Sequence, residues 1–164
     1  MKSVAAWTNE QFDPRLSWAD VDWVRQRWGG KFILKGIMEV EDAKLAVEHG
    51  ADAIVVSNHG GRQLDGAPSS IRALPAIVDA VGTRTEVWLD GGIRSGQDVL
   101  KAWALGARGT MIGRAAVYGL GAMGEAGVTK ALQIIHKELD VTMAFCGHTQ
   151  LTNVDHGILR PGTY

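Results

Sequence analysis

The chain has 164 residues with 17 basic and 18 acidic side chains, so its formal net charge is −1. This balance argues against a protein that binds nucleic acid by neutralising phosphates. The length suits one globular domain with a sizeable core, and the single cysteine, Cys146, cannot form an internal disulfide. No apolar run approaches the ~18 residues that a membrane span needs, and the first residues lack the apolar segment of a secretory signal.

Short apolar runs alternate with helical patterns along the chain. The first helix is predicted over 17–28, with Ser17 as N-cap and Gly29-Gly30 at its end. Four runs rich in β-branched residues predict buried strands at 32–34, 53–56, 87–89 and 110–112. Apolar stripes at helical spacing predict helices over 41–49, 71–81, 97–105 and 128–139. This alternation predicts βα units and a parallel sheet in a single domain over 1–164, with irregular ends at 1–14 and 147–164.

An internal repeat gives the size of one βα unit. When the chain is shifted by 56 positions, segment 33–57 lies on 89–113 with six identities in 25 positions, at strand ends, helix starts and helix ends. The repeat holds two units, so eight units need about 224 residues, close to the ~250 of a closed (β/α)8 barrel. With four clear strands the chain is about half of such a barrel, or else a small open sheet.

Polar and charged residues follow each predicted strand. Because the carboxyl ends of parallel strands meet at one edge of a sheet, we expect these residues to face one another there. Their positive excess indicates an anionic ligand. They are Lys35; Ser57, Asn58, His59 and Arg62; Asp90 and Arg94; and Gly113 and Arg114.

The last two units carry the candidate phosphate site. Asp90-Gly91-Gly92-Ile93-Arg94-Ser95-Gly96 opens one helix and Gly113-Arg114 opens the next. Glycines let backbone N–H groups approach phosphate oxygens, and helix N-termini favour negative charge. The alternative is that these glycines only form tight βα turns, and Arg94 and Arg114 favour the phosphate site over it.

His59 is the candidate base. A histidine can take a proton near neutral pH, and Arg62, three residues later, can hold a carboxylate in a bidentate pair. The alternative is a loop histidine with only local hydrogen bonds. For the other four histidines a structural role is favoured, and no His, Cys or Asp spacing predicts a metal site.

Four segments together resemble one enzyme family. LKGI at 34–37, VVSNHGGRQLDG at 55–66, LDGGIRSGQDVLKAWALGA at 89–107 and IGRA at 112–115 resemble the FMN-dependent α-hydroxy-acid oxidases and dehydrogenases. The SNHGGRQLD segment is highly specific, whereas DGGIR followed by GR is shared more widely. Two further stretches, DPRLSW and WGGKFILKG, are most similar to those of bacterial L-lactate dehydrogenases. The resemblance extends from about residue 12 to about residue 152.

The resemblance implies a fold, a cofactor and a role for each site residue. The fold is a (β/α)8 TIM barrel, of which this chain holds the C-terminal half with strands five to eight. His59 would take a proton from the substrate and Arg62 would bind its carboxylate. The residues implied to hold FMN are Lys35, near the N1–C2=O edge of the flavin, with Ser57, Asp90, Gly91, Gly92, Arg94, Gly113 and Arg114.

The implied activity is oxidation of an L-2-hydroxy acid, L-lactate first among the candidates, to the 2-oxo acid. A non-catalytic FMN- or phosphate-binding half-barrel and an inactive truncated product are the alternatives, because the family's first half-barrel carries further flavin and substrate contacts. We expect a homo-oligomer or a complementary N-terminal half as partner and no nucleic acid. We expect a cytoplasmic location, with peripheral attachment to the inner membrane left open.

Overall fold

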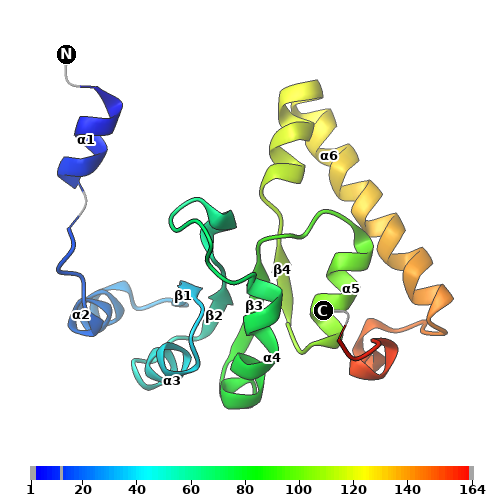
Figure 1. Cartoon of the computed structure of the whole chain (residues 1–164), viewed down its shortest axis with the longest axis horizontal. Helices are drawn as coiled ribbons and strands as arrows, with labels where there is room; N and C mark the ends of the chain where they lie inside the picture. The colour runs from blue at the N-terminus through cyan, green and yellow to red at the C-terminus, as the bar shows by residue number, and fades with distance from the viewer. Residues whose placement is uncertain (1–2, 12, 163–164) are drawn as a thin grey trace.

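A four-stranded parallel sheet lies at the centre of the computed structural model, which describes residues 3–11 and 13–162. The strands lie side by side in chain order, β1-β2-β3-β4 (Figure 1). Their bounds are Ile33–Ile37 for β1, Ala53–Val56 for β2, Glu86–Asp90 for β3 and Gly109–Met111 for β4. All four predicted strands are confirmed, and the parallel α/β half-barrel architecture with them.

The predicted helices are confirmed, with shifted ends. They are α2 (Trp18–Trp28), α3 (Val40–Glu48), α4 (Ser70–Val81), α5 (Gly96–Ala104) and α6 (Arg114–Phe145). Ser17 caps α2 through a capping box with Asp20, and Gly29 ends the helix at a φ of 68°. A short 3₁₀ turn, η1 (His59–Gly61), follows β2.

The two ends of the chain are more ordered than the sequence predicted. Helix α1 (Val4–Gln11) occupies part of the segment expected to be irregular, because the Ser3 hydroxyl accepts a hydrogen bond from Ala6 N and so caps its first turn. Residues 1, 2 and 12 lie outside the described residues. Near the other end, two 3₁₀ turns, η2 (Leu151–Asn153) and η3 (His156–Ile158), flank Val154, which packs against α5. Residues 163–164 are also outside the described part.

The core lies between the sheet and the helices that cover one of its faces. Ile54 and Val56 of β2 and Val87 and Leu89 of β3 are at most 1% exposed and pack in one cluster with residues of α3, α4 and α5. Side chains alternate along a strand, so the neighbours of these residues lie on the opposite face of the sheet. On that face Lys35, Val55 and Trp88 are register partners across β1, β2 and β3.

The internal repeat predicted from the sequence is present in the structure. Shifting by 56 residues places α3 on α5, with the same bounds, and β2 on β4. The shift does not place β1 on β3, because β3 begins three residues before the position that corresponds to Ile33. A register shift between Lys35 and Ile37 places Gly36 in a bulge of β1, with a φ of 98°.

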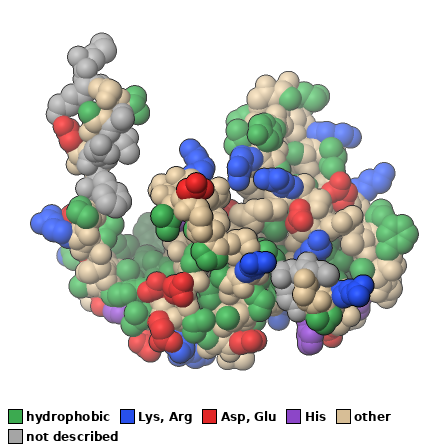
Figure 2. All heavy atoms as spheres, viewed as in Figure 1, with side chains coloured by type: hydrophobic (Ala, Val, Ile, Leu, Met, Phe, Trp, Pro, Cys, Tyr) green, Lys and Arg blue, Asp and Glu red, His purple; other side chains and the backbone are tan. Residues whose placement is uncertain are grey.

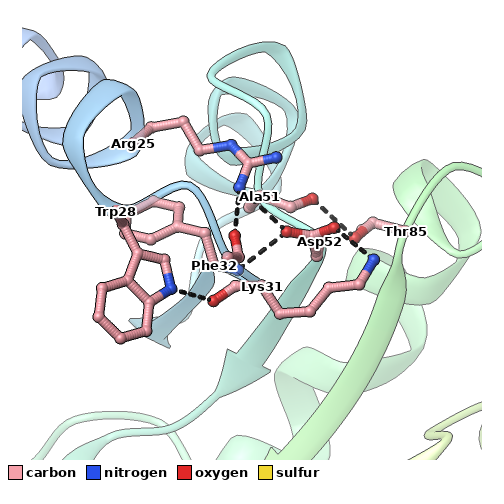
Figure 3. A network of polar contacts seen from close by, with 8 residues as sticks. Arg25, Trp28, Lys31, Phe32, Ala51, Asp52 and Thr85 are labelled. Atoms are coloured by element: carbon pink, nitrogen blue, oxygen red, sulfur yellow. Dashed lines mark hydrogen bonds and ion pairs between the residues drawn. The ribbon is translucent and has the colours of Figure 1, made fainter.

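Asp52 joins the segments that enter the first two strands (Figure 3). Its carboxylate pairs with Lys31 at 2.9 Å and Arg25 at 3.4 Å, and accepts a hydrogen bond from Phe32 N at 2.8 Å. Thr85, at the entry to β3, donates to the neighbouring Ala51 carbonyl. This network holds the amino ends of β1, β2 and β3 together, on the side of the sheet opposite the predicted site.

Helix α6 is two helical segments joined by a sharp reversal. Met123 and Gly124 have non-helical backbone angles, and the chain turns back there (Figure 1). The reversal brings Gly119 and Gly127 into backbone contact, with no room for a Cβ on either residue. Over the described residues, no helix combines the length and apolar character needed to cross a membrane.

Candidate active site

The residues singled out in the sequence meet at the carboxyl edge of the sheet. The strand-end residues other than Ser57 and Asn58 line a single cavity of about 500 Å³. Figure 2 shows Lys and Arg side chains around the hollow between the loop after β2 and the start of α6. The lining residues that were predicted are Lys35, His59, Arg62, Asp90, Gly91, Gly92, Arg94, Gly113 and Arg114. The cavity lies within the usual range for small-molecule sites, ~300–1,000 Å³.

Ser57 lies directly beneath the cavity and connects three of its groups. It is fully buried, and its hydroxyl donates to Asp90 Oδ2 at 2.6 Å. Ser57 Oγ also accepts hydrogen bonds from Lys35 Nζ at 3.1 Å and from His59 N at 3.1 Å. One side chain at the end of β2 therefore couples the ends of β1 and β3 to the loop that carries the candidate base.

Lys35 and Asp90 form an ion pair on the cavity wall. Lys35 Nζ lies 2.9 Å from Asp90 Oδ2, and the side chain of Asp90 is only 17% exposed. Burial raises the pKa of the Asp90 carboxyl, but hydrogen bonds from Ser57 and Lys35 and the Lys35 charge outweigh it. The resulting pKa is below the ordinary value of 3.8. Asp90 is therefore a carboxylate that holds a cation at the cavity.

The first turns of α5 and α6 differ in how far their backbone N–H groups are already bonded. The first N–H groups of α5 are already used, since Gly96 N donates to Glu138 Oε2 at 2.9 Å and the Ser95–Asp98 capping box closes the turn. By contrast, Gly113 precedes α6 without a side-chain cap, and nothing lies within 4 Å of its Cβ position. The sequence assigned helix N-terminal donors to both segments, and in the structure those of Gly96 and Asp98 in α5 already have partners.

The glycine-rich turn after β3 adds further open backbone. Gly91 and Gly92 have φ values of 99° and 82°, and nothing lies within 4 Å of the Cβ position at Gly92. With Arg94 and Arg114 on the same wall, this surface fits a phosphate group in both charge and shape.

The structure adds cavity residues that the sequence did not single out. Gln63, Ile93, Met111, Ala115 and Val117 also line the space. Of these, Met111 could have been anticipated from strand register, since it is the partner of Asp90 across β3 and β4. Val117 could not, because its exposure to the cavity depends on how α6 leaves β4.

The other histidines lie away from the cavity. His49 ends α3, where its Nδ1 pairs with Asp22 at 2.6 Å and its ring stacks on Trp18, so it ties α2 to α3. His136 is exposed on α6. Neither lines the cavity that contains His59.

Comparison with known proteins identifies the family. The family model described as FMN-dependent dehydrogenase matches residues 1–161. The chain belongs to this family. FMN is the cofactor of the family, and the cation and glycine surface described above is consistent with its phosphate. An L-lactate dehydrogenase of Caulobacter vibrioides is 52% identical over 159 residues, which are 97% of this chain and 42% of that protein.

Two solved structures of the family are similar in fold. The monotopic membrane protein (S)-mandelate dehydrogenase superposes with a TM-score of 0.90 at 39% identity, covering 95% of this chain and 41% of that one. A mandelate oxidase variant with a monooxide FMN adduct has a TM-score of 0.82 at 47% identity, covering 87% of this chain and 45% of that one. The chain thus spans less than half the length of the relatives it matches, as expected for half of a TIM barrel.

Proposed function

We propose that this chain carries the FMN and base-bearing half of an enzyme that oxidises an L-2-hydroxy acid, L-lactate first, to the 2-oxo acid. The observation that supports this most directly is the single cavity that joins His59 and Arg62 to the Lys35–Asp90 pair and the phosphate-type surface. The likeness to L-lactate dehydrogenases favours lactate over larger hydroxy acids.

His59 and Arg62 would act on the substrate. Arg62 makes no ion pair with any described residue, so its guanidinium is free to bind a carboxylate in a bidentate pair. His59 lies on the same turn and would take the proton from the substrate. Their common turn places the base close to the anchored end of a small hydroxy acid.

Lys35 and the phosphate-type surface would hold FMN at its two ends. Lys35, fixed by Asp90 and Ser57, would lie at the N1–C2=O edge of the ring, where a cation stabilises negative charge. Gly91, Gly92, Gly113, Arg94 and Arg114 would hold the phosphate. Bound FMN supplies the acceptor for the two electrons that leave the substrate.

The sheet itself suggests how the barrel is completed. β1 and β4 each pair with one strand among the described residues, and on the face that carries Lys35 and Trp88 the edge residues Ile33 and Met111 are 42% and 38% exposed. We propose that a complementary N-terminal half-barrel or a second copy of the chain covers this face. The second candidate function is an FMN-binding half-barrel without turnover. It is favoured by the phosphate-type surface, because all the residues of that surface belong to this chain.

The cellular location is proposed from a relative. One relative of known structure is a monotopic membrane protein, which favours peripheral membrane attachment of a cytoplasmic enzyme. Flotation of the purified chain with vesicles of bacterial lipids tests this point.

A flavin titration tests the function. The chain is mixed with FMN, its visible spectrum is recorded, and L-lactate, (S)-mandelate or glycolate is added without oxygen. Bleaching of the bound flavin by L-lactate supports the proposal, and bound flavin that none of the three bleaches supports the non-catalytic alternative. A chain that binds no FMN contradicts both.

His59→Ala tests the assignment of the base. We expect this variant to keep FMN and to lose bleaching by about 10²–10⁴-fold in rate, the usual contribution of a general base. His136→Ala, on the exposed surface of α6, is the matched control and should behave as the unmodified chain. Loss of FMN binding in His59→Ala would contradict the assignment.

A further inference from the structure

The backbone of His59 has an unusual conformation. Its φ is 55°, and it is the one non-glycine residue of the described chain with a positive φ. Residues in this region persist only where the surrounding structure determines them strongly, and they cluster at functional sites. The contacts around His59 therefore show what fixes the candidate base.

Two side chains hold the turn from the strand side. Ser57 Oγ accepts from His59 N at 3.1 Å. Asn58 Oδ1 accepts from the next two N–H groups, at 3.0 Å from Gly60 and 3.3 Å from Gly61, and its Nδ2 donates to the Pro68 carbonyl at 3.0 Å. Asn58 thus clamps η1 at its start and ties it to the segment before α4.

The imidazole of His59 occupies space that Gly36 leaves open. A Cβ at position 36 would lie 2.7 Å from His59 Cε1 and 3.6 Å from each ring nitrogen. Both nitrogens therefore flank the edge that faces the β1 bulge. Gly36 directly follows Lys35, so this contact also sets where the base lies relative to the Lys35 ammonium.

We propose that Gly36 and Asn58 are positioning residues for His59, with Gly36 as the surface against which the ring rests and Asn58 as the clamp that holds its backbone. The inference about position stands on these contacts alone, and its effect on catalysis rests on the proposed function. A side chain at position 36 pushes the ring outward, because the atom it meets is the far end of a side chain rather than backbone.

Gly36→Ala tests the ring contact. In the FMN-free chain we expect a nuclear Overhauser cross-peak between His59 Hε1 and Gly36 Hα, and a clear shift of the His59 Hε1 resonance in the variant. In the FMN-loaded chain we expect kcat for L-lactate to fall about 10²-fold, as for a ~1 Å misplacement, with KM and FMN affinity within about 3-fold. Gly29→Ala is the matched control, since Gly29 also has a positive φ, 68°, but nothing within 4 Å of its Cβ position.

Asn58 variants test the clamp. Asn58→Ala should weaken the same cross-peak and lower kcat. Asn58→Asp keeps the acceptor for Gly60 N and Gly61 N but loses the donor to the Pro68 carbonyl, so it should restore both only in part. Asp155→Ala removes a comparable cap, a carboxylate that accepts from Gly157 N at 2.7 Å far from the site, and should change neither.

The two readouts separate this inference from the proposed function. Absence of the cross-peak in the unmodified chain, or a His59 Hε1 resonance that does not move in Gly36→Ala, overturns the positioning role. A chain that shows both signals but does not oxidise L-lactate overturns the proposed function and supports the positioning of His59.

Discussion

At the scale of single residues, Asp90 is a charged group that holds the cavity wall together. Its carboxylate accepts from Ser57 and pairs with Lys35, and its pKa is lowered in the folded chain. We expect Asp90→Asn to lower the free energy of unfolding at neutral pH by about 1 kcal/mol, because a charge-assisted interaction becomes a neutral one.

The pH dependence of this effect has a definite sign. Since the folded pKa of Asp90 is below 3.8, the carboxylate stabilises the fold fully above that value and loses its contribution as pH falls through the folded pKa. Urea unfolding of the FMN-free unmodified chain and of Asp90→Asn, between neutral pH and pH ~3, measures the difference in their free energies of unfolding. This difference should become smaller on acidification. A difference that stays constant with pH would show that the Asp90 charge does not cause it.

The strand-end residues could be predicted from local sequence, and their supporting contacts could not. An apolar run that ends in Lys35 or Asp90 indicates a residue at the carboxyl edge of a parallel sheet, and the structure places both there. The contact of Gly36 with His59 depends on a bulge in β1 and on a positive φ in η1, which no local pattern encodes. The catalytic and cofactor roles of these residues stay predictions.

At the scale of elements, the reversal in α6 packs the first segment of the helix, which begins at Arg114, against the second. The sequence predicted the helix only over 128–139, because the glycines of its first part interrupt the apolar stripe. The structure shows their use, since Gly119 and Gly127 allow two helical segments to touch backbone to backbone. The first of these segments carries Arg114, Ala115 and Val117, which line the cavity.

Gly127→Ala tests this packing. A Cβ at position 127 would lie 2.6 Å from Gly119 C, so the two segments must separate. We expect a loss of about 1–3 kcal/mol in stability, the usual cost of overpacking, together with weaker FMN binding. Gly121→Ala is the matched control on the same helix, with nothing within 4 Å of its Cβ position, and should gain up to about 1 kcal/mol. Circular dichroism melting and FMN titration measure both, and equal effects of the two variants would contradict the packing role.

At the scale of the whole molecule, the chain is well packed on one face of its sheet, and the other face, called the open face below, is exposed at its edge strands while Val55 at its centre is 2% exposed. The helix-facing residues of β2 and β3 are at most 1% exposed, whereas Ile33 at the edge strand β1 is 42% exposed and Met111 of β4 is 38% exposed. The half-barrel could be predicted from the repeat and the strand count, because both depend on the length of one βα unit. What covers the open face could not, because that depends on residues of another half or another copy.

The open face leads to a prediction about association. Unpaired strand edges and exposed apolar side chains promote pairing between chains. We expect the purified chain to self-associate in a concentration-dependent way, and Ile33→Lys to shift the equilibrium toward the monomer, since it places a charge beside the β1 edge. Val141→Lys is the control, because Val141 is also 42% exposed but lies on α6, away from the sheet. Sedimentation velocity at several concentrations distinguishes them. Equal effects of the two lysines would show that the contact is not specific to the β1 edge, and a monomer at every concentration would show that the open face needs no second copy.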